Sequence, residues 1–198
     1  MQPPPREDKR RVEEDATAEL GRFRPYLQML ARLEFDDILR SKLDASDVVQ
    51  QTLLEAHQSL AEFRGKGDPE KAAWLRRILT RNLADELRKF HRLKRDVRLE
   101  ASLQAALNES TARLEKWLAI EGGTPSDDAI AHERLVALAA ALLELPEDQR
   151  TAVELHHLQG CPSAVIAQRM VRTEIAVAGL LRRGLKRLRE LIREDDAR

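Results

Sequence analysis

The chain has 198 residues, and its 34 lysines and arginines are balanced by 34 aspartates and glutamates, so its total charge indicates no particular partner. A single cysteine, Cys161, excludes an internal disulfide and fits a reducing cytosol. No apolar run is long enough to span a membrane, and the N-terminus lacks the apolar segment of a signal peptide. These features predict a cytoplasmic protein that does not insert into a membrane. Because aromatic residues are few and β-branched alternating runs are missing, we also predict an all-α fold.

The first elements of the chain are marked by proline. Residues 1–16 are rich in proline and charge, and we predict a disordered tail there. A first helix is predicted from Thr17 to Leu33, interrupted or bent near Pro25, because proline cannot donate the hydrogen bond of a helix interior. A second, short helix is predicted around Phe35 to Leu39.

The next helix is predicted from Asp47 to Phe63, with Asp44 or Ser46 as its N-cap. Apolar residues recur along it at steps of three or four, which is typical of a face that packs on a core. These residues are Val49, Leu53, Ala56 and Leu60. The opposite face carries the polar residues Asp47, Gln50, Gln51, Glu55 and Gln58. Taken alone, such a face is more often solvated than bound to a partner.

A loop with two glycines and a proline, residues 64–69, precedes a helix with two unlike faces between Trp74 and Arg92. At 100° per residue its apolar side chains share one broad arc, and its arginines lie within about 60° of one another on the far side. This arginine face consists of Arg77, Arg81, Arg88 and Arg92, with Trp74 at its edge. For a lone helix, a solvated face and a surface for a polyanion are equally good interpretations. Glu86 falls inside the apolar arc, where a carboxylate needs a partner, and we expect an arginine from a neighbouring helix.

Positive charge is concentrated in two separate stretches. Residues 71–98 carry ten basic and three acidic side chains, a net charge of +7, and residues 172–193 carry seven and two, a net charge of +5. Two basic helices on a neutral chain suggest two contacts with one nucleic acid.

Residues 99–130 are predicted to connect two halves, residues 17–98 and 131–198. A helix is expected from about Leu99 to Leu118, and glycine and proline punctuate residues 121–126. We interpret the whole stretch as a flexible interdomain linker. Trp117 is expected to be a packing anchor rather than a base-stacking residue.

The second half is predicted to end in a helix-turn-helix. Helices are expected at about residues 126–143 and 146–159, then a short helix at 164–170 and a basic helix at 174–193. The three-residue break before the last helix ends in Thr173, a suitable N-cap. In a helix-turn-helix the second helix lies in the major groove of DNA, but many helical hairpins share this pattern.

No group of side chains indicates catalysis, a metal or a cofactor. His156 and His157 are adjacent and point about 100° apart on a helix, so they cannot chelate one ion. His157 and Cys161 are spaced like two ligands, but Gly160 and Pro162 end the helix there and no second cysteine follows. A glycine-rich phosphate loop and a nucleophile elbow are both missing. We therefore predict a protein that is not an enzyme and holds neither cofactor nor metal.

Two sets of motifs resemble one family. The sequences DASDVVQQT at 44–52, WL at 74–75 and NLADELR at 82–88 resemble domain 2 of the extracytoplasmic-function (ECF) sigma factors, the compact initiation factors of bacterial RNA polymerase. LPEDQR at 145–150, IA at 166–167, AV at 176–177 and RGLKRL at 183–188 resemble their domain 4. The two blocks stand in the family's order with no domain 3 between them, and they cover most of the chain.

The resemblance implies three contacts. Core RNA polymerase would be held by Asp44, Asp47, Gln50, Gln51 and Glu55. The −10 element would be held by Phe63, Arg64, Lys66, Trp74, Arg77, Arg81, Asn82, Arg88 and Arg92, with a flipped base captured at the loop of residues 63–68. The −35 element would be read by Arg172, Thr173, Glu174, Arg182, Arg183, Lys186 and Arg187. An anti-sigma factor or another regulatory protein is a further partner that the resemblance allows.

Val171 departs from the family pattern, which usually has glycine in the turn of the helix-turn-helix. A β-branched residue is a genuine outlier at positive φ. Either this turn has another geometry, or the chain stores roughly 1–2 kcal/mol of strain there. The base-facing positions Ile175, Ala176 and Gly179 are also poor in hydrogen-bond donors.

We therefore expect a two-domain, helical transcription initiation factor that directs core RNA polymerase to a promoter. One alternative is a stand-alone helix-turn-helix regulator that binds duplex DNA without polymerase. Another is an interaction protein with the same fold, such as one that sequesters a sigma factor. The surface from Asp44 to Gln58 and the presence of a second basic helix favour the initiation factor, because a simple regulator needs neither.

Overall fold

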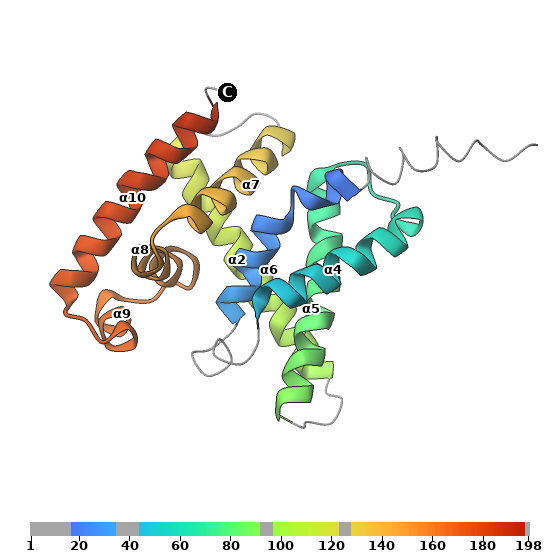
Figure 1. Ribbon diagram of the computed structural model, residues 1–198, viewed down its shortest axis with the longest axis horizontal. Coiled ribbons are helices and arrows are strands. Elements are labelled where there is room, and N and C mark those ends of the chain that lie inside the picture. Colours follow the sequence, from blue (N-terminus) through green and yellow to red (C-terminus); the bar gives the residue numbers. More distant parts are fainter. Residues whose placement is uncertain (1–16, 35–43, 92–96, 123–127, 197–198) are drawn as a thin grey trace, which may run out of the picture.

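The computed structural model describes residues 17–34, 44–91, 97–122 and 128–196, and within these ranges every regular element is a helix (Figure 1). The predicted all-α fold is thus confirmed. The elements are α2 (Arg24–Glu34), α4 (Ala45–Ser59), the 3₁₀ turn η1 (Leu60–Glu62), α5 (Asp68–His91), α6 (Val97–Gly122), α7 (Asp128–Glu144), α8 (Glu147–Val153), the π-helical turn η2 (Glu154–Leu158), α9 (Ser163–Met170) and α10 (Glu174–Asp196). The predicted tail of residues 1–16 and the short helix predicted around Phe35 lie outside the described residues.

The first two helices begin where their capping chemistry allows. Residues 17–21 are helical, a turn follows at 22–23, and Pro25 lies in the first turn of α2, where its missing N–H needs no partner. The predicted interruption near Pro25 is confirmed. At the start of α4, Asp44 Oδ1 accepts a hydrogen bond from the backbone N of Ser46 at 2.8 Å. Asp44, rather than Ser46, is therefore the N-cap.

The apolar faces predicted for α4 and α5 pack on the core. Val49 and Ala56 are buried on α4, and Leu53 and Leu60 are half-buried. The buried residues of α5 include Leu75, Ile78, Leu79, Leu83 and Leu87. The two helices pack against each other, with α4 lying across α5 (Figure 1).

α2 lies at the centre of the described structure and contacts α4, α5, α6 and α7. Its Tyr26 is fully buried, and the Tyr26 hydroxyl accepts a hydrogen bond from Arg76 Nη1 at 2.8 Å. The same hydroxyl lies 3.0 Å from Thr111 Oγ1 of α6. These bonds satisfy the buried hydroxyl and fix α2 against both α5 and α6.

The C-terminal end of α2 connects the two halves of the chain. Arg32 Nη2 lies 2.9 Å from Glu147 Oε1 and Arg32 Nε lies 3.6 Å from Glu154 Oε1, on α8 and η2. Beside them, Gln159 Nε2 donates a hydrogen bond to the Leu33 carbonyl at 2.8 Å. The halves therefore meet through charged and polar contacts as well as through a shared apolar core.

The stretch predicted as a flexible linker is a packed helix over most of its length. α6 covers residues 97–122, and its Leu103, Leu107 and Leu114 are buried in the core that also contains α2, α5 and α7. The helix predicted from Leu99 to Leu118 is confirmed, whereas the flexibility predicted for this helix is wrong, because its three buried leucines, spaced by four and seven residues, form a stripe that the core covers. Trp117 stacks on His157 with ring centroids 4.6 Å apart, as expected of a packing anchor.

The helix-turn-helix predicted near the C-terminus is confirmed. α9 and α10 are separated by residues 171–173, and Thr173 Oγ1 accepts a hydrogen bond from the backbone N of Ala176 at 3.2 Å. Val177 and Leu188 of α10 are buried, and Gly184 between them is covered by α8. The helix predicted at residues 146–159 is α8 followed by η2. It differs from the prediction because Glu154–Leu158 is a π-helical turn.

Candidate nucleic-acid interface

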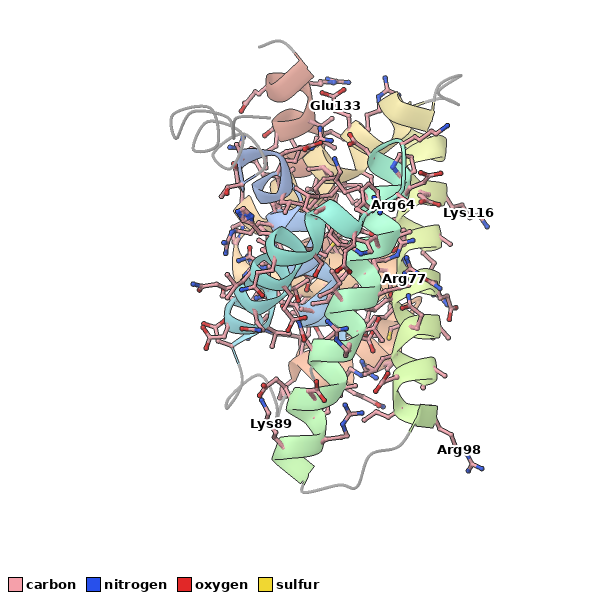
Figure 2. All side chains as sticks on the ribbon, turned by 90° about the vertical axis from the view of Figure 1, so that its right-hand side faces the viewer. Arg64, Arg77, Lys89, Arg98, Lys116 and Glu133 are labelled. Carbon is pink, nitrogen blue, oxygen red and sulfur yellow. The ribbon has the colours of Figure 1, made fainter. Side chains whose placement is uncertain are left out.

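The arginine face of α5 is less fully cationic than its sequence predicts. Figure 2 looks onto α5 between α4 and α6, with Arg77 in the middle of the helix. Arg77 is exposed, whereas Arg81 Nη2 lies 2.5 Å from Glu55 Oε2 of α4. Arg88 is only 11% exposed and pairs with Asp85 and, at 3.0 Å, with Glu100 of α6. Arg92 lies outside the described residues.

An aromatic pair, Phe63 and Trp74, lies at the N-terminal end of this face. Their ring centroids are 5.1 Å apart with planes tilted by 34°. Gly65 makes the arrangement possible, because a Cβ at that position would collide with the Phe63 ring. The loop is held further by Glu70 Oε2, which accepts a hydrogen bond from the backbone N of Lys66 at 2.5 Å. Arg64 and Lys66 stay exposed on the loop, so cations flank a half-buried aromatic surface.

A polar groove of about 460 Å³ runs between α4 and α5. Its lining residues are Asp44, Asp47, Val48, Gln51, Glu55, Asn82, Asp85, Glu86 and Lys89. Of the five residues predicted to bind polymerase, Gln50 alone does not line the groove, and it is exposed on α4. The structure therefore brings these predicted side chains together on one surface, to which α5 adds further acids.

The charge in the groove is negative. Burial raises the pKa of Glu55, but hydrogen bonds from Gln51 and Arg81 more than offset this and lower the pKa below its ordinary value. Glu55 is therefore ionised at neutral pH. Glu86 also faces the groove, and its Oε1 lies 2.7 Å from Lys89 Nζ. The neighbouring-helix arginine expected for Glu86 is wrong: its partner is a lysine one turn along the same helix.

Asn82 has a different position from the other predicted DNA-binding residues. Its side chain is buried, and Nδ2 donates a hydrogen bond to Thr52 Oγ1 at 3.2 Å. The bond joins α5 to α4 at the floor of the groove, which Asn82 lines. Its amide is therefore directed into the protein and not toward the arginine face, so we leave Asn82 out of the DNA surface proposed below.

Of the two geometries expected for the turn between α9 and α10, the structure has the strained one, with Val171 at positive φ. Val171 adopts φ 52° and ψ 50°, the left-handed region, and it is the only non-glycine residue at positive φ among the described residues. Its side chain is 87% exposed, so packing does not compensate for the conformation. Next to it, Arg172 Nη2 lies 3.1 Å from Asp148 Oδ2 of α8. This contact between two exposed groups connects the turn to α8 in the C-terminal half of the chain.

The outer face of α10 presents four of the predicted cations, Arg182, Arg183, Lys186 and Arg187, all exposed. Acids on the same helix accompany the last two. Glu190 lies 4.0 Å from Lys186 and 3.4 Å from Arg187, and Glu194 lies 3.8 Å from Arg187. The signal was present in the sequence, since these acids stand three to seven residues further along the helix. Glu174 lies exposed at the helix start, beside the capping Thr173.

Comparison with known proteins gives a match for each half of the chain. Residues 22–93 match the model of Sigma-70 region 2, and residues 135–188 match the model of Sigma-70, region 4. The chain is also 30% identical over 166 residues to the ECF RNA polymerase sigma factor SigM of Mycobacterium tuberculosis, in strains Erdman and H37Rv, covering 84% of this chain and 71% of that protein. The chain belongs to the ECF sigma factors. It is a transcription initiation factor of a family that binds core RNA polymerase and promoter DNA.

Membership of the sigma factors distinguishes between the expected functions. A stand-alone regulator would account for the helix-turn-helix in the region 4 match but not for the region 2 match over α2, α4 and α5. The initiation factor accounts for both. Among the described helices none is long and apolar enough to cross a membrane.

Proposed function

We propose that this sigma factor binds core polymerase through the α4–α5 groove and promoter DNA through two cationic surfaces. The observation that carries the proposal is the contact between Arg81 and Glu55. It joins the arginine face of α5 to the acidic groove, so that a polymerase element in the groove lies next to DNA on α5. The proposed place of action is the cytoplasm, where polymerase and promoter meet.

The groove is suited to a basic element of the polymerase. Asp47 and Gln51 are exposed on its rim, and Gln51 Nε2 donates a hydrogen bond to Glu55 at 3.0 Å. Asp47→Arg with Gln51→Arg should keep the fold, because neither side chain is buried, but should abolish binding by placing positive charge against positive charge.

Co-purification with core polymerase tests this contact, with circular dichroism as the check on folding. Ser102→Arg with Ala105→Arg is the matched control, because both positions are exposed on α6 and away from the groove. We expect the control to co-purify with polymerase. A folded groove variant that binds polymerase as well as the control does would contradict the proposal.

The aromatic pair and Arg77 form the surface proposed for the −10 element. Stacking on an aromatic side chain is worth roughly 1–3 kcal/mol per base, and arginines on the same face contact the backbone phosphates. Arg77→Ala should therefore reduce promoter opening by the holoenzyme, measured as permanganate-reactive thymines near −10. Lys116→Ala removes an exposed cation of α6 and should leave opening unchanged (Figure 2). Equal opening by both variants would remove Arg77 from the DNA surface.

α10 is the element proposed to read the −35 sequence in the major groove. Arg182 and Arg183 are exposed near its N-terminal half, which a helix-turn-helix presents to base edges. Arg183→Ala should cost a factor of about 5–150 at one base pair if the side chain reads a base, which corresponds to roughly 1–3 kcal/mol. If it contacts phosphate alone, affinity should fall evenly across sequences.

A regulatory partner is proposed at the same groove. An anti-sigma factor that covers the α4–α5 surface would exclude polymerase from it. Competition between a candidate partner and core polymerase for the unmodified chain, and loss of both contacts in the Asp47→Arg, Gln51→Arg variant, would test this extension.

A further inference from the structure

Exposed apolar side chains gather at the helix-turn-helix. Four large hydrophobic residues are exposed in the described part of the chain, and three of them, Val165, Val171 and Ile175, lie within residues 165–175. Single exposed hydrophobic residues are common on protein surfaces. Ile175 is unusual because it is 86% exposed, so that almost the whole side chain is in water.

Ile175 begins the stripe of α10 that faces away from the protein. At 100° per residue, Ile175, Gly179, Arg182 and Lys186 share one side of the helix. The buried side, with Val177 and Leu188, lies opposite. The stripe is therefore apolar at its N-terminal end and cationic further along, where Arg182 and Lys186 are exposed.

This surrounding charge favours duplex DNA over an apolar protein partner. Arg182 and Arg183 are exposed further along the helix, Arg172, before the helix, is exposed and paired with Asp148, and the helix N-terminus adds the positive end of the helix dipole. The acid next to Ile175 is Glu174, which is exposed at the helix start. Phosphates on either side of a major groove are stabilised by such a frame, whereas an apolar protein surface would leave these cations unmatched.

Gly179, on the same stripe, allows a side chain to approach the helix backbone closely. A Cβ at this position would lie 3.2 Å from Arg183 Nη1, so the Arg183 side chain lies against the backbone of Gly179. Helix side chains lean toward the N-terminus, and the guanidinium is thereby carried toward Ile175. One hydrogen-bond donor, held at Gly179, thus lies about one helical turn from the apolar Ile175 on the same side of α10.

We propose that Ile175 is a specificity-determining residue that contacts the C5 methyl group of one thymine in the major groove. Thymine is the base that shows a methyl group there, and apolar side chains are its usual contacts. The inference rests on the proposed −35 function of α10 and adds a base contact to it. It also gives the donor-poor helix start a means of reading sequence.

Replacement of thymine by deoxyuridine tests the contact, since it removes only the C5 methyl group. The holoenzyme would first select preferred sequences from duplexes randomised around −35, and each thymine of the selected sequence would then be replaced in turn. We expect one replacement to weaken binding about four-fold, the equivalent of one methyl-sized group left in water. Ile175→Ala should bind about four-fold more weakly to the thymine duplex and show no further loss with uracil at that position.

Two variants make the comparison specific. Ile175→Val keeps an apolar branch and should keep most of the methyl effect, whereas Arg183→Ala should weaken binding but leave the uracil penalty unchanged. Ile175→Ala should remain folded, because alanine favours a helix and the isoleucine is exposed.

The outcomes separate the inference from the function on which it rests. Failure of the holoenzyme to select any −35 sequence would remove the proposed reading by α10 and the inference with it. A selected sequence without a methyl effect, or a methyl effect that persists in Ile175→Ala, overturns the inference alone. So does an Ile175→Ala protein that loses polymerase binding but keeps its discrimination of DNA, which would assign the residue to a protein partner.

Discussion

Removal of the Arg32 guanidinium should destabilise the contact between the two halves of the chain. Arg32 is 23% exposed and approaches Glu154, whose side chain is 1% exposed, and Glu147, which is 62% exposed. Loss of one partner of a buried ion pair costs roughly 3–5 kcal/mol, because the other charge remains buried. Surface pairs contribute about 0–1 kcal/mol, so most of the effect comes from Glu154.

We expect Arg32→Met to lower the free energy of unfolding by about 3 kcal/mol, the low end of that range, because Arg32 is not fully buried. Methionine keeps the length of the side chain and its helix propensity. Urea denaturation followed by circular dichroism gives the free energy, and an unchanged m-value shows that the compared states are the same.

A second substitution identifies the origin of the loss. If the cost is that of a buried charge, Arg32→Met with Glu154→Gln should be more stable than Arg32→Met alone by about 2 kcal/mol, since a neutral amide replaces the carboxylate. Arg22→Met breaks the pair of Arg22 with Asp68, in which neither side chain is buried (45% and 24% exposed), and should cost less than about 1 kcal/mol. An Arg32→Met protein within 1 kcal/mol of the unmodified chain, or a double variant no more stable than the single one, would refute the reasoning.

Three further predictions concern the turn, a half-buried acid and the aromatic pair. Val171→Gly should stabilise the protein by about 0.5–1 kcal/mol in thermal unfolding, because relief of roughly 1–2 kcal/mol of strain exceeds the added freedom of the unfolded chain; a loss of stability would contradict the strain. Burial raises the pKa of Glu34 to about 7, so the folded state keeps a proton that the unfolded state releases. Stability should then fall as pH rises from about 4.5 to 7, by about 1–2 kcal/mol for this partly exposed group, and Glu34→Gln should flatten that slope in denaturation curves. Gly65→Ala should displace Phe63 from Trp74 and change the tryptophan fluorescence, whereas Gly67→Ala should not, since its Cβ would meet nothing closer than Pro69 Cδ at 3.7 Å.

Apolar periodicity was sufficient to locate the helices, because burial acts on every turn of a helix. The leucines of α5 and the stripe of α10 are where the spacing places them. The same rule would have identified α6 as packed, since Leu103, Leu107 and Leu114 step by four and seven. The glycine and proline run at residues 121–126 does not predict flexibility for the whole stretch, because such punctuation is a local signal.

The partners that site residues take from other helices could not be predicted from the spacing along one helix. Glu100 approaches Arg88 from α6, and Glu55 approaches Arg81 from α4. Periodicity gives the face on which a side chain lies, but it gives neither the rotation of the neighbouring helix nor the rotamer of its acid. For the same reason the resemblance, which implies a DNA contact for Asn82, does not predict that its amide donates to Thr52 of α4.

The net charges of +7 and +5 in the sequence therefore overstate the cations available to DNA. On α5, Arg81 and Arg88 are paired with carboxylates, whereas Arg77 makes no ion pair among the described residues. On α10, Lys186 and Arg187 share Glu190, and a phosphate at either must displace a carboxylate. Few phosphates can then be neutralised at each surface, which makes each alone a weak DNA contact. Strong promoter binding should arise only when polymerase holds both surfaces on one DNA, because the second contact then becomes intramolecular and gains from a high effective concentration.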